Sequence, residues 1–203
     1  MMHRERRPLP RSFYESEDVV TLSRQLIGKV LCTCKNGCYT SGIITETEAY
    51  SGRNGLACHA NDGLRTDRTE IMYGPGGFAY VYLCYGIHHL FNVVVNKKEL
   101  ADAILIRAIE PLEGIDIMKQ RRKIKKSSKP IAAGPGMMSQ ALGIHRNDYG
   151  VDLTNGSSPI WIEDCNLPVI ESLINASPRI GVDYAGEDAM RNWRFYTKQF
   201  HSF

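Results

Sequence analysis

The stretch from residue 42 to residue 52, GIITETEAYSG, places two carboxylates, Glu46 and Glu48, in a run that is otherwise apolar and β-prone. Acidic side chains are poor strand formers and are costly to bury. Side chains two residues apart share one face of a strand, so Glu46, Glu48 and Tyr50 are expected together, with the two carboxylates about 7 Å apart. The two carboxylates are therefore expected either on a face of the strand that is exposed to solvent or in a functional site that uses their negative charge.

The composition fits one domain with a continuous core, because the chain has 203 residues of which 43% are hydrophobic. Six cysteines are scattered without CxxC spacing, and the sequence has no signal-peptide pattern and no long apolar span. We therefore expect an intracellular, reducing location, free thiols and no membrane insertion. Cys32, Cys34 and Cys38 lack the spacing of a zinc site and a clear fourth ligand, so no metal is expected.

Basic residues are concentrated in two segments. Residues 119–129, KQRRKIKKSSK, contain seven Lys or Arg and no acid, so the rest of the chain is net negative although the whole carries +3. The N-terminal HRERRPLPR is the second basic patch. Each patch can be a solvated segment or a contact for a polyanion. We expect residues 1–12 to form a flexible basic arm and residues 13–203 to form a single domain.

The order of periodic segments predicts an α+β domain with a curved, mostly antiparallel, roll-like or barrel-like sheet and peripheral helices. A helix that Ser16 caps and Gly28 ends should precede a hairpin that turns at Asn36-Gly37. Further strands are expected within residues 78–96 and 103–109, and a helix from about Leu112 to Ile124. Residues 51–76 are polar and too long for a simple connector, so we expect a functional loop.

Several side chains suit chemistry as well as a structural role. An acidic pair beside an aromatic residue suits hydrolysis of a glycosidic bond, because an oxocarbenium-like transition state needs nearby negative charge and an activated water. Tyr85 and Ile87 are apolar residues at a hairpin turn, where they can pack or insert between stacked bases. Asn92 and Arg107 interrupt apolar strands, and a buried arginine requires a carboxylate, a phosphate or a water as partner.

Six sequence blocks follow one another along the chain: ETEAYSG, His59, GFAYVYLCYGIHHLFNVV, ILIRAIEPLEG, GPGMMSQALGI, and RIGVDYAGE followed by WRFY. Together they resemble the 3-methyladenine (alkyladenine) DNA glycosylase family, from about Phe13 to Tyr196. The resemblance implies a DNA repair enzyme that flips alkylated or deaminated purines out of double-stranded DNA. It would then hydrolyse the N-glycosidic bond and leave an abasic site.

The resemblance also implies a role for each residue of the site. Glu48 would be the general base that deprotonates the water attacking C1′ of the deoxyribose, with Glu46 in support. Arg107 and the backbone at Ile180 would hold that water. The implied base pocket consists of Tyr50, His59, Tyr82, Asn92 and Ile180. In it, Tyr50 and Tyr82 would stack on the two faces of the extruded base, and Asn92 would screen against the amino group of normal guanine.

Contacts with the DNA itself follow from the same resemblance. Tyr85, with Ile87 beside it, would fill the gap that the extruded nucleotide leaves. The chain departs from the family at Thr69, where an asparagine is usual, and at Met137, where a lysine is usual, so phosphate contacts at these two points are doubtful. The phosphate contacts expected instead are Arg65, Arg68, Lys125 and Lys126.

Two alternatives from other functional classes remain open. The first is a module that binds damaged DNA without cleaving it, which Glu48 and Arg107 disfavour because binding needs neither a base nor a water clamp. The second is a nucleoside hydrolase, which the hairpin tip and the basic run disfavour. Binding that weakens steeply with salt would indicate a duplex partner. For the glycosylase we expect a monomer without metal or organic cofactor, and monofunctional hydrolysis because no lysine nucleophile is implied.

Overall fold

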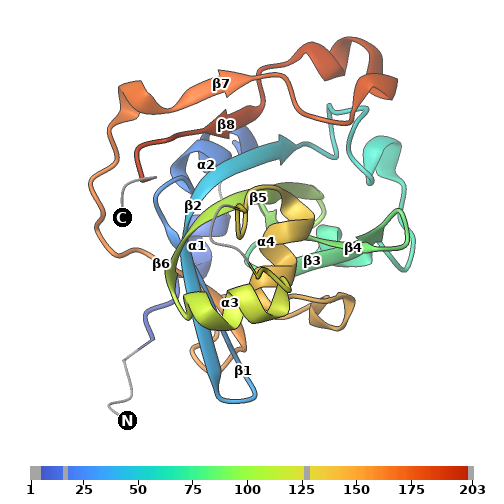
Figure 1. The fold of residues 1–203 in the computed structure, drawn as a ribbon. Helices are drawn as coiled ribbons and strands as arrows, with labels where there is room; N and C mark the ends of the chain where they lie inside the picture. The colour runs from blue at the N-terminus through green and yellow to red at the C-terminus, as the bar shows by residue number, and fades with distance from the viewer. Residues whose placement is uncertain (1–5, 16–17, 126–128, 201–203) are drawn as a thin grey trace.

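A strongly curved antiparallel sheet of eight strands forms the centre of the computed structural model, which describes residues 6–15, 18–125 and 129–200 (Figure 1). The strands are β1 (Val30–Lys35), β2 (Cys38–Tyr50), β3 (Ala79–Cys84), β4 (His88–Val95), β5 (Asp102–Glu113), β6 (Ile160–Glu163), β7 (Asn175–Ser177) and β8 (Arg194–Tyr196). Their order is β3-β4-β5-β2-β1-β6, and the second half of β2 also pairs with β8, which pairs with β7. The sheet stays open, so the predicted α+β class is confirmed with a rolled sheet and no closed barrel.

Short helices cover the sheet. The α-helices are α1 (Arg11–Tyr14), α2 (Val19–Gln25), α3 (Ile115–Arg121) and α4 (Pro135–Leu142). The 3₁₀ turns are η1 (Asn61–Gly63), η2 (Glu70–Tyr73), η3 (Arg146–Asp148), η4 (Glu171–Leu173) and η5 (Asp183–Met190). Figure 1 shows α3 and α4 in front of the sheet and α2 behind it, so that both faces are covered. In the described part of the chain, no helix is long and apolar enough to cross a membrane.

The hairpin between β1 and β2 forms where the sequence predicts it. Asn36 and Gly37 have φ values of 52° and 75°, the pair of positive angles that a two-residue hairpin turn of this hand requires. The cap of α2 differs from the prediction, because the carboxylate of Asp18 accepts hydrogen bonds from the backbone N–H groups of Val20 and Thr21. Ser16, the predicted cap, lies outside the described residues.

The boundary between β5 and α3 is also different from the prediction. Residues 112 and 113 continue β5, and α3 begins only at Ile115, so the predicted helix start at Leu112 is wrong. The strand tolerates Pro111 because the register of its partner β2 shifts between Ser41 and Gly42, opposite this proline. Gly114, with a φ of 73°, provides the left-handed residue that ends the strand and turns the chain into α3.

The long polar loop of residues 51–76 is tied to the sheet by one buried carboxylate. Asp102, at the start of β5, is fully buried and accepts hydrogen bonds from the backbone of Gly52 and from the side chains of Arg53 and Asn96. Cys58 and Met72 of the loop are buried in a small apolar cluster with residues of β3 and β5. The loop is therefore a packed part of the domain and holds the end of β2 in place.

In the described part of the predicted N-terminal arm, residues 6–9 lie against β6 and the turn before it. Arg6 donates hydrogen bonds to the carbonyl groups of Gly156 and Ser158, and its guanidinium lies 4.4 Å from the Trp161 ring centroid. The backbone N–H of Leu9 donates to the carbonyl of Ile162. A domain boundary near residue 12 stays a prediction.

We predict that Asp102→Ala lowers the free energy of unfolding by about 3 kcal/mol, because the buried N–H of Gly52 and the buried side-chain amide of Asn96 lose their acceptor and Arg53 loses an ion pair. Asp116→Ala is the matched control, since the side chain of Asp116 is fully exposed and its ion pair with Lys119 is a surface contact. Urea unfolding of both variants measures the difference. Equal unfolding midpoints for the two variants would show that Asp102 does not hold the loop.

Candidate active site

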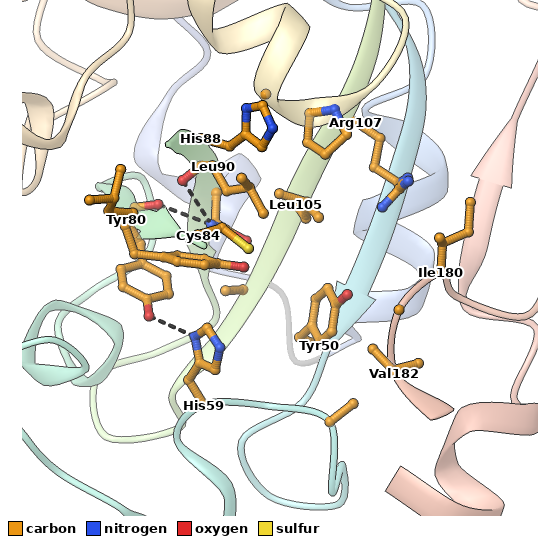
Figure 2. Close-up of a pocket in the computed structure, with 18 of the residues that line it drawn as sticks. Tyr50, His59, Tyr80, Cys84, His88, Leu90, Leu105, Arg107, Ile180 and Val182 are labelled. Carbon is orange, nitrogen blue, oxygen red and sulfur yellow. Dashed lines mark hydrogen bonds between the residues drawn. The ribbon is translucent and has the colours of Figure 1, made fainter. Parts of the chain in front are cut away.

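A cavity of about 630 Å³ opens at the carboxyl end of β2, between the sheet and the loops around it. Its walls come from β2, β3, β4, β5, the loop around His59, the start of α4 and residues 180–184. Figure 2 shows His59 and Tyr80 on one side of the cavity and Tyr50, Ile180 and Val182 on the other. The predicted site residues that line it are Tyr50, His59, Arg68, Tyr82, Tyr85, Asn92, Arg107 and Ile180.

Glu48 lies directly behind the cavity wall and is fully buried. Its Oε1 atom accepts a hydrogen bond of 2.8 Å from the backbone N–H of Ile180. Its Oε2 atom accepts one of 2.8 Å from the Tyr50 hydroxyl and lies 3.2 Å from the Arg107 guanidinium. All three partners line the cavity, so the carboxylate is separated from the cavity by residues to which it is bonded.

The second carboxylate shares the same face of β2, as the two-residue period predicts. Glu46 Oε1 accepts hydrogen bonds from Arg107 Nε at 2.7 Å and from Arg194 Nε at 2.6 Å. Burial lowers the pKa of Arg107, but the charges of Glu48 and Glu46 outweigh it, so the pKa is raised and the guanidinium stays charged. The β2–β5 register shifts on both sides of Glu46. Such bulges re-aim side chains, and here they bring Arg107 between the two carboxylates.

Three aromatic rings on the opposite wall contact one another. His59 Nδ1 and the Tyr80 hydroxyl share a hydrogen bond of 2.8 Å, and the His59 ring meets the Tyr82 ring edge-on with centroids 4.7 Å apart. Burial, with a smaller contribution from the charge of Arg68, lowers the pKa of His59 to about 4. His59 is therefore neutral at pH 7. Tyr80 was not among the predicted site residues, although it shares the strand face of Tyr82 and also lines the cavity.

The ring of Tyr50 is supported from outside the cavity by a buried arginine that the sequence did not reveal. The Arg179 guanidinium lies 4.9 Å from the centroid of the Tyr50 ring and donates to the carbonyl groups of Ala49 and Asp188. Asp188 forms an ion pair of 3.0 Å with Arg179 and also accepts a hydrogen bond from the backbone of Ala57. These contacts join β2, η5 and the loop around His59, which are far apart in sequence.

The hairpin between β3 and β4 carries the predicted inserting residues at its tip. Tyr85 is 92% exposed and Ile87 is 72% exposed, so neither side chain is used by the core. Tyr85 also lies at the edge of the cavity. Asn92, in β4, is buried in the cavity wall, and its side-chain amide donates to the backbone carbonyl groups of Tyr80 and Leu90.

The predicted phosphate contacts are not gathered in one place. Arg65 forms ion pairs with Glu70 and Glu99 and does not line the cavity, whereas Arg68 does. Lys125 is exposed, and Lys126 lies outside the described residues. Of the two departures from the family pattern, Met137 lines the cavity. Thr69 is buried and donates a hydrogen bond to the carbonyl of Leu64, which gives it a structural role in the loop.

Side chains that could bind a metal ion are dispersed. Among the residues that the structure describes, no group of three or more His, Cys, Asp or Glu could hold one. Glu46 and Glu48 are instead used by guanidinium groups, as described above. All six cysteines are free thiols, and burial raises the pKa of Cys58 to about 11.

The buried, neutral His59 should make the protein less stable in acid. Its pKa is about 4 in the folded protein against an ordinary value of 6.5, so the unfolded chain binds this proton first. The corresponding stability is present above about pH 6.5 and is lost as the pH falls toward about 4. We predict that wild type loses more stability than His59→Gln between pH 7 and pH 4, measured by urea unfolding. The exposed His88→Gln is the control, and equal losses in all three proteins would contradict the prediction.

Comparison with known proteins identifies the family. The family model described as methylpurine-DNA glycosylase matches residues 12–201. A protein named "Putative 3-methyladenine DNA glycosylase" from Methanocella arvoryzae is 44% identical to this chain, and the alignment covers 94% of this chain and 92% of the relative. A protein of the same name from Chlamydia felis is also 44% identical, over 92% of this chain and 94% of its own length. A protein of the same name from Clostridium perfringens is 42% identical, over 94% of this chain and 95% of its own length. The resemblance drawn from the sequence blocks is thereby confirmed, and the chain belongs to the methylpurine-DNA glycosylase family.

Proposed function

We propose that this protein is a DNA repair glycosylase that removes alkylated or deaminated purines from duplex DNA and leaves an abasic site. One observation carries the proposal: the buried carboxylate of Glu48, bound by Arg107 and by the N–H of Ile180 beside a cavity with aromatic walls. Membership of the family and the names of the relatives support the same reaction.

In the proposed reaction, water attacks C1′ of the damaged nucleotide. The C1′–O bond forms, the C1′–N bond breaks, the purine leaves with the electron pair of that bond, and Glu48 accepts the proton of the water. A carboxylate offers roughly four acceptor positions, of which Ile180, Tyr50 and Arg107 use three, so one remains for the water. Arg107 and the N–H of Ile180 also hold the Glu48 side chain in place beside the cavity.

The cavity suits a purine held by stacking. Its volume of about 630 Å³ is in the usual range for small-molecule sites. We propose that Tyr50 and Tyr82 contact the two faces of the base, which accommodates cationic alkylated purines through the electron-rich rings. The neutral His59 can hydrogen-bond to the base or its sugar, and Asn92 is proposed to exclude the amino group of normal guanine. No lysine lines the described part of the cavity, which supports direct hydrolysis over a covalent mechanism.

We further propose that the hairpin tip keeps the nucleotide extruded. Tyr85 and Ile87 expose apolar surface to water, and inserting it between base pairs would remove that exposure and replace the stacking that the flipped nucleotide loses. Arg68, with Arg65, Lys125 and Lys126, is proposed to contact the phosphates of the duplex. The enzyme is expected to act as a monomer inside the cell, where its DNA substrate is.

We predict that Glu48→Gln lowers the single-turnover excision rate by about 10²- to 10⁴-fold, the usual contribution of a general base. Binding to a duplex with a stable abasic-site analogue should change by less than about 3-fold, since Gln keeps the size of the side chain. Oligonucleotides that each carry hypoxanthine, 3-methyladenine, 7-methylguanine or ethenoadenine, treated with alkali after incubation, reveal excision. The control is Glu163→Gln, which changes a buried carboxylate outside the cavity lining. Wild-type excision by Glu48→Gln would refute the proposed mechanism.

We predict that Tyr85→Ser weakens binding to the abasic-analogue duplex by about 5- to 100-fold, since stacking an aromatic side chain on a base contributes about 1–3 kcal/mol. Binding titrations measure the constant, and 2-aminopurine fluorescence next to the lesion reports the extruded state. Leu173→Ser is the matched control, because it removes an exposed apolar side chain outside the cavity lining. An unchanged binding constant for Tyr85→Ser would rule out the inserting role.

A further inference from the structure

A second exposed aromatic side chain lies at the mouth of the cavity. Tyr184, in η5, is 72% exposed and nevertheless lines the cavity. Its hydroxyl donates a hydrogen bond of 3.4 Å to the carbonyl of Ala57, in the loop that leads to His59. The ring is therefore anchored at its polar end while most of its apolar surface faces water.

The wall that carries Tyr184 faces the wall that carries the hairpin. Ile180 and Val182 lead into η5 and lie on one side of the cavity, and Cys84, next to Tyr85, lies on the other (Figure 2). Tyr82, Tyr85 and Tyr184 all line this one cavity. Tyr82 is half-buried, whereas Tyr85 and Tyr184 are mostly exposed, so Tyr82 lies inside the cavity and the other two lie at its mouth.

Core packing does not explain this arrangement, because the ring of Tyr184 is mostly exposed. Exposure alone does not mark a binding residue either, since Met190 at the other end of η5 is 75% exposed and does not line the cavity. What distinguishes Tyr184 is the combination of an exposed ring, a fixed hydroxyl and a position at the mouth. An aromatic ring that is already fixed loses little conformational entropy when a ligand packs on it.

We propose that Tyr184 is a second DNA-contacting aromatic residue, which packs against the extruded nucleotide at the mouth of the cavity, opposite Tyr85. This proposal rests on the proposed function and adds a residue to it. An extruded nucleotide loses its stacking with both neighbours, and the two tyrosines replace it in different places. Tyr85 fills the gap in the duplex, whereas Tyr184 contacts the nucleotide that has left it. The proposed role of Tyr184 is to bind the nucleotide, whereas Glu48 and Arg107 are the residues proposed to take part in the reaction itself.

The experiment compares Tyr184→Ala with Tyr184→Phe and with Met190→Ala, which removes an exposed apolar side chain from the same element. Each protein is titrated with a duplex that contains a stable abasic-site analogue and with the undamaged duplex, and single-turnover excision of hypoxanthine is measured over a range of enzyme concentration. For Tyr184→Ala we expect binding to the analogue duplex to weaken by about 5- to 30-fold and the half-saturating enzyme concentration to rise in parallel. The maximal excision rate should stay within about 3-fold of wild type.

The controls and the undamaged duplex make the outcome decisive. Tyr184→Phe keeps the ring and should bind within about 3-fold of wild type, as should Met190→Ala. Binding of Tyr184→Ala to undamaged DNA should change by less than about 2-fold. The proposed role of Tyr184 would be wrong if Tyr184→Ala bound the analogue duplex as tightly as Met190→Ala does, or if it lost the same affinity for both duplexes. Neither result would affect the proposed glycosylase function, provided that wild type excises the damaged base. Failure of wild type to excise any damaged purine would instead refute the proposed function, and the binding comparison would still decide the role of Tyr184.

Discussion

The guanidinium of Arg107, between two carboxylates of one strand face, is the interaction on which the rest of the site depends. Glu46 and Glu48 point in the same direction from β2, so they would repel each other and lose hydration without a cation between them. Removing one partner from such a buried arrangement typically costs about 3–5 kcal/mol. The register of β2 against β5 shifts on both sides of Glu46, at the place where Arg107 of β5 contacts both acids.

A second buried arginine explains how the loops keep their positions around that centre. Arg179 joins the backbone of Ala49, next to Glu48, to Asp188 in η5, and Asp188 reaches on to the backbone of Ala57. The strand that carries the carboxylate, the segment that closes the cavity and the loop that carries His59 are thus held by one network. The aromatic walls and the carboxylate are therefore held in one connected network of contacts.

The sequence predicts interactions that depend on local periods and turn chemistry. The shared face of Glu46, Glu48 and Tyr50 follows from the period of a strand, and the turn at Asn36-Gly37 follows from its residues. The prediction that a helix starts at Leu112 was wrong because β5 continues through Pro111. Whether a strand can continue through a proline depends on its pairing with the neighbouring strand, which lies far away in the sequence. Arg179 and Asp102 were missed for the same reason, since each ties segments that are distant in sequence: Arg179 bonds to Ala49, 130 residues away, and Asp102 to Gly52, 50 residues away. The family resemblance assigned roles to the residues that line the cavity, but it assigned none to Arg179, Asp188 or Asp102.

The charges around the cavity bear on how a damaged purine would be recognised. Both carboxylates of β2 are already paired with guanidinium groups, so they offer little net attraction to a cationic base. His59 is neutral at pH 7, and one face of the Tyr50 ring is covered by Arg179. If the proposed function holds, stacking and shape must therefore select the base more than ion pairing does. Selection by stacking is tolerant of charge, because neutral and cationic purines present similar faces. Under the proposed function, one cavity would then accept both deaminated and alkylated purines, with Glu48 as the proposed base in both reactions.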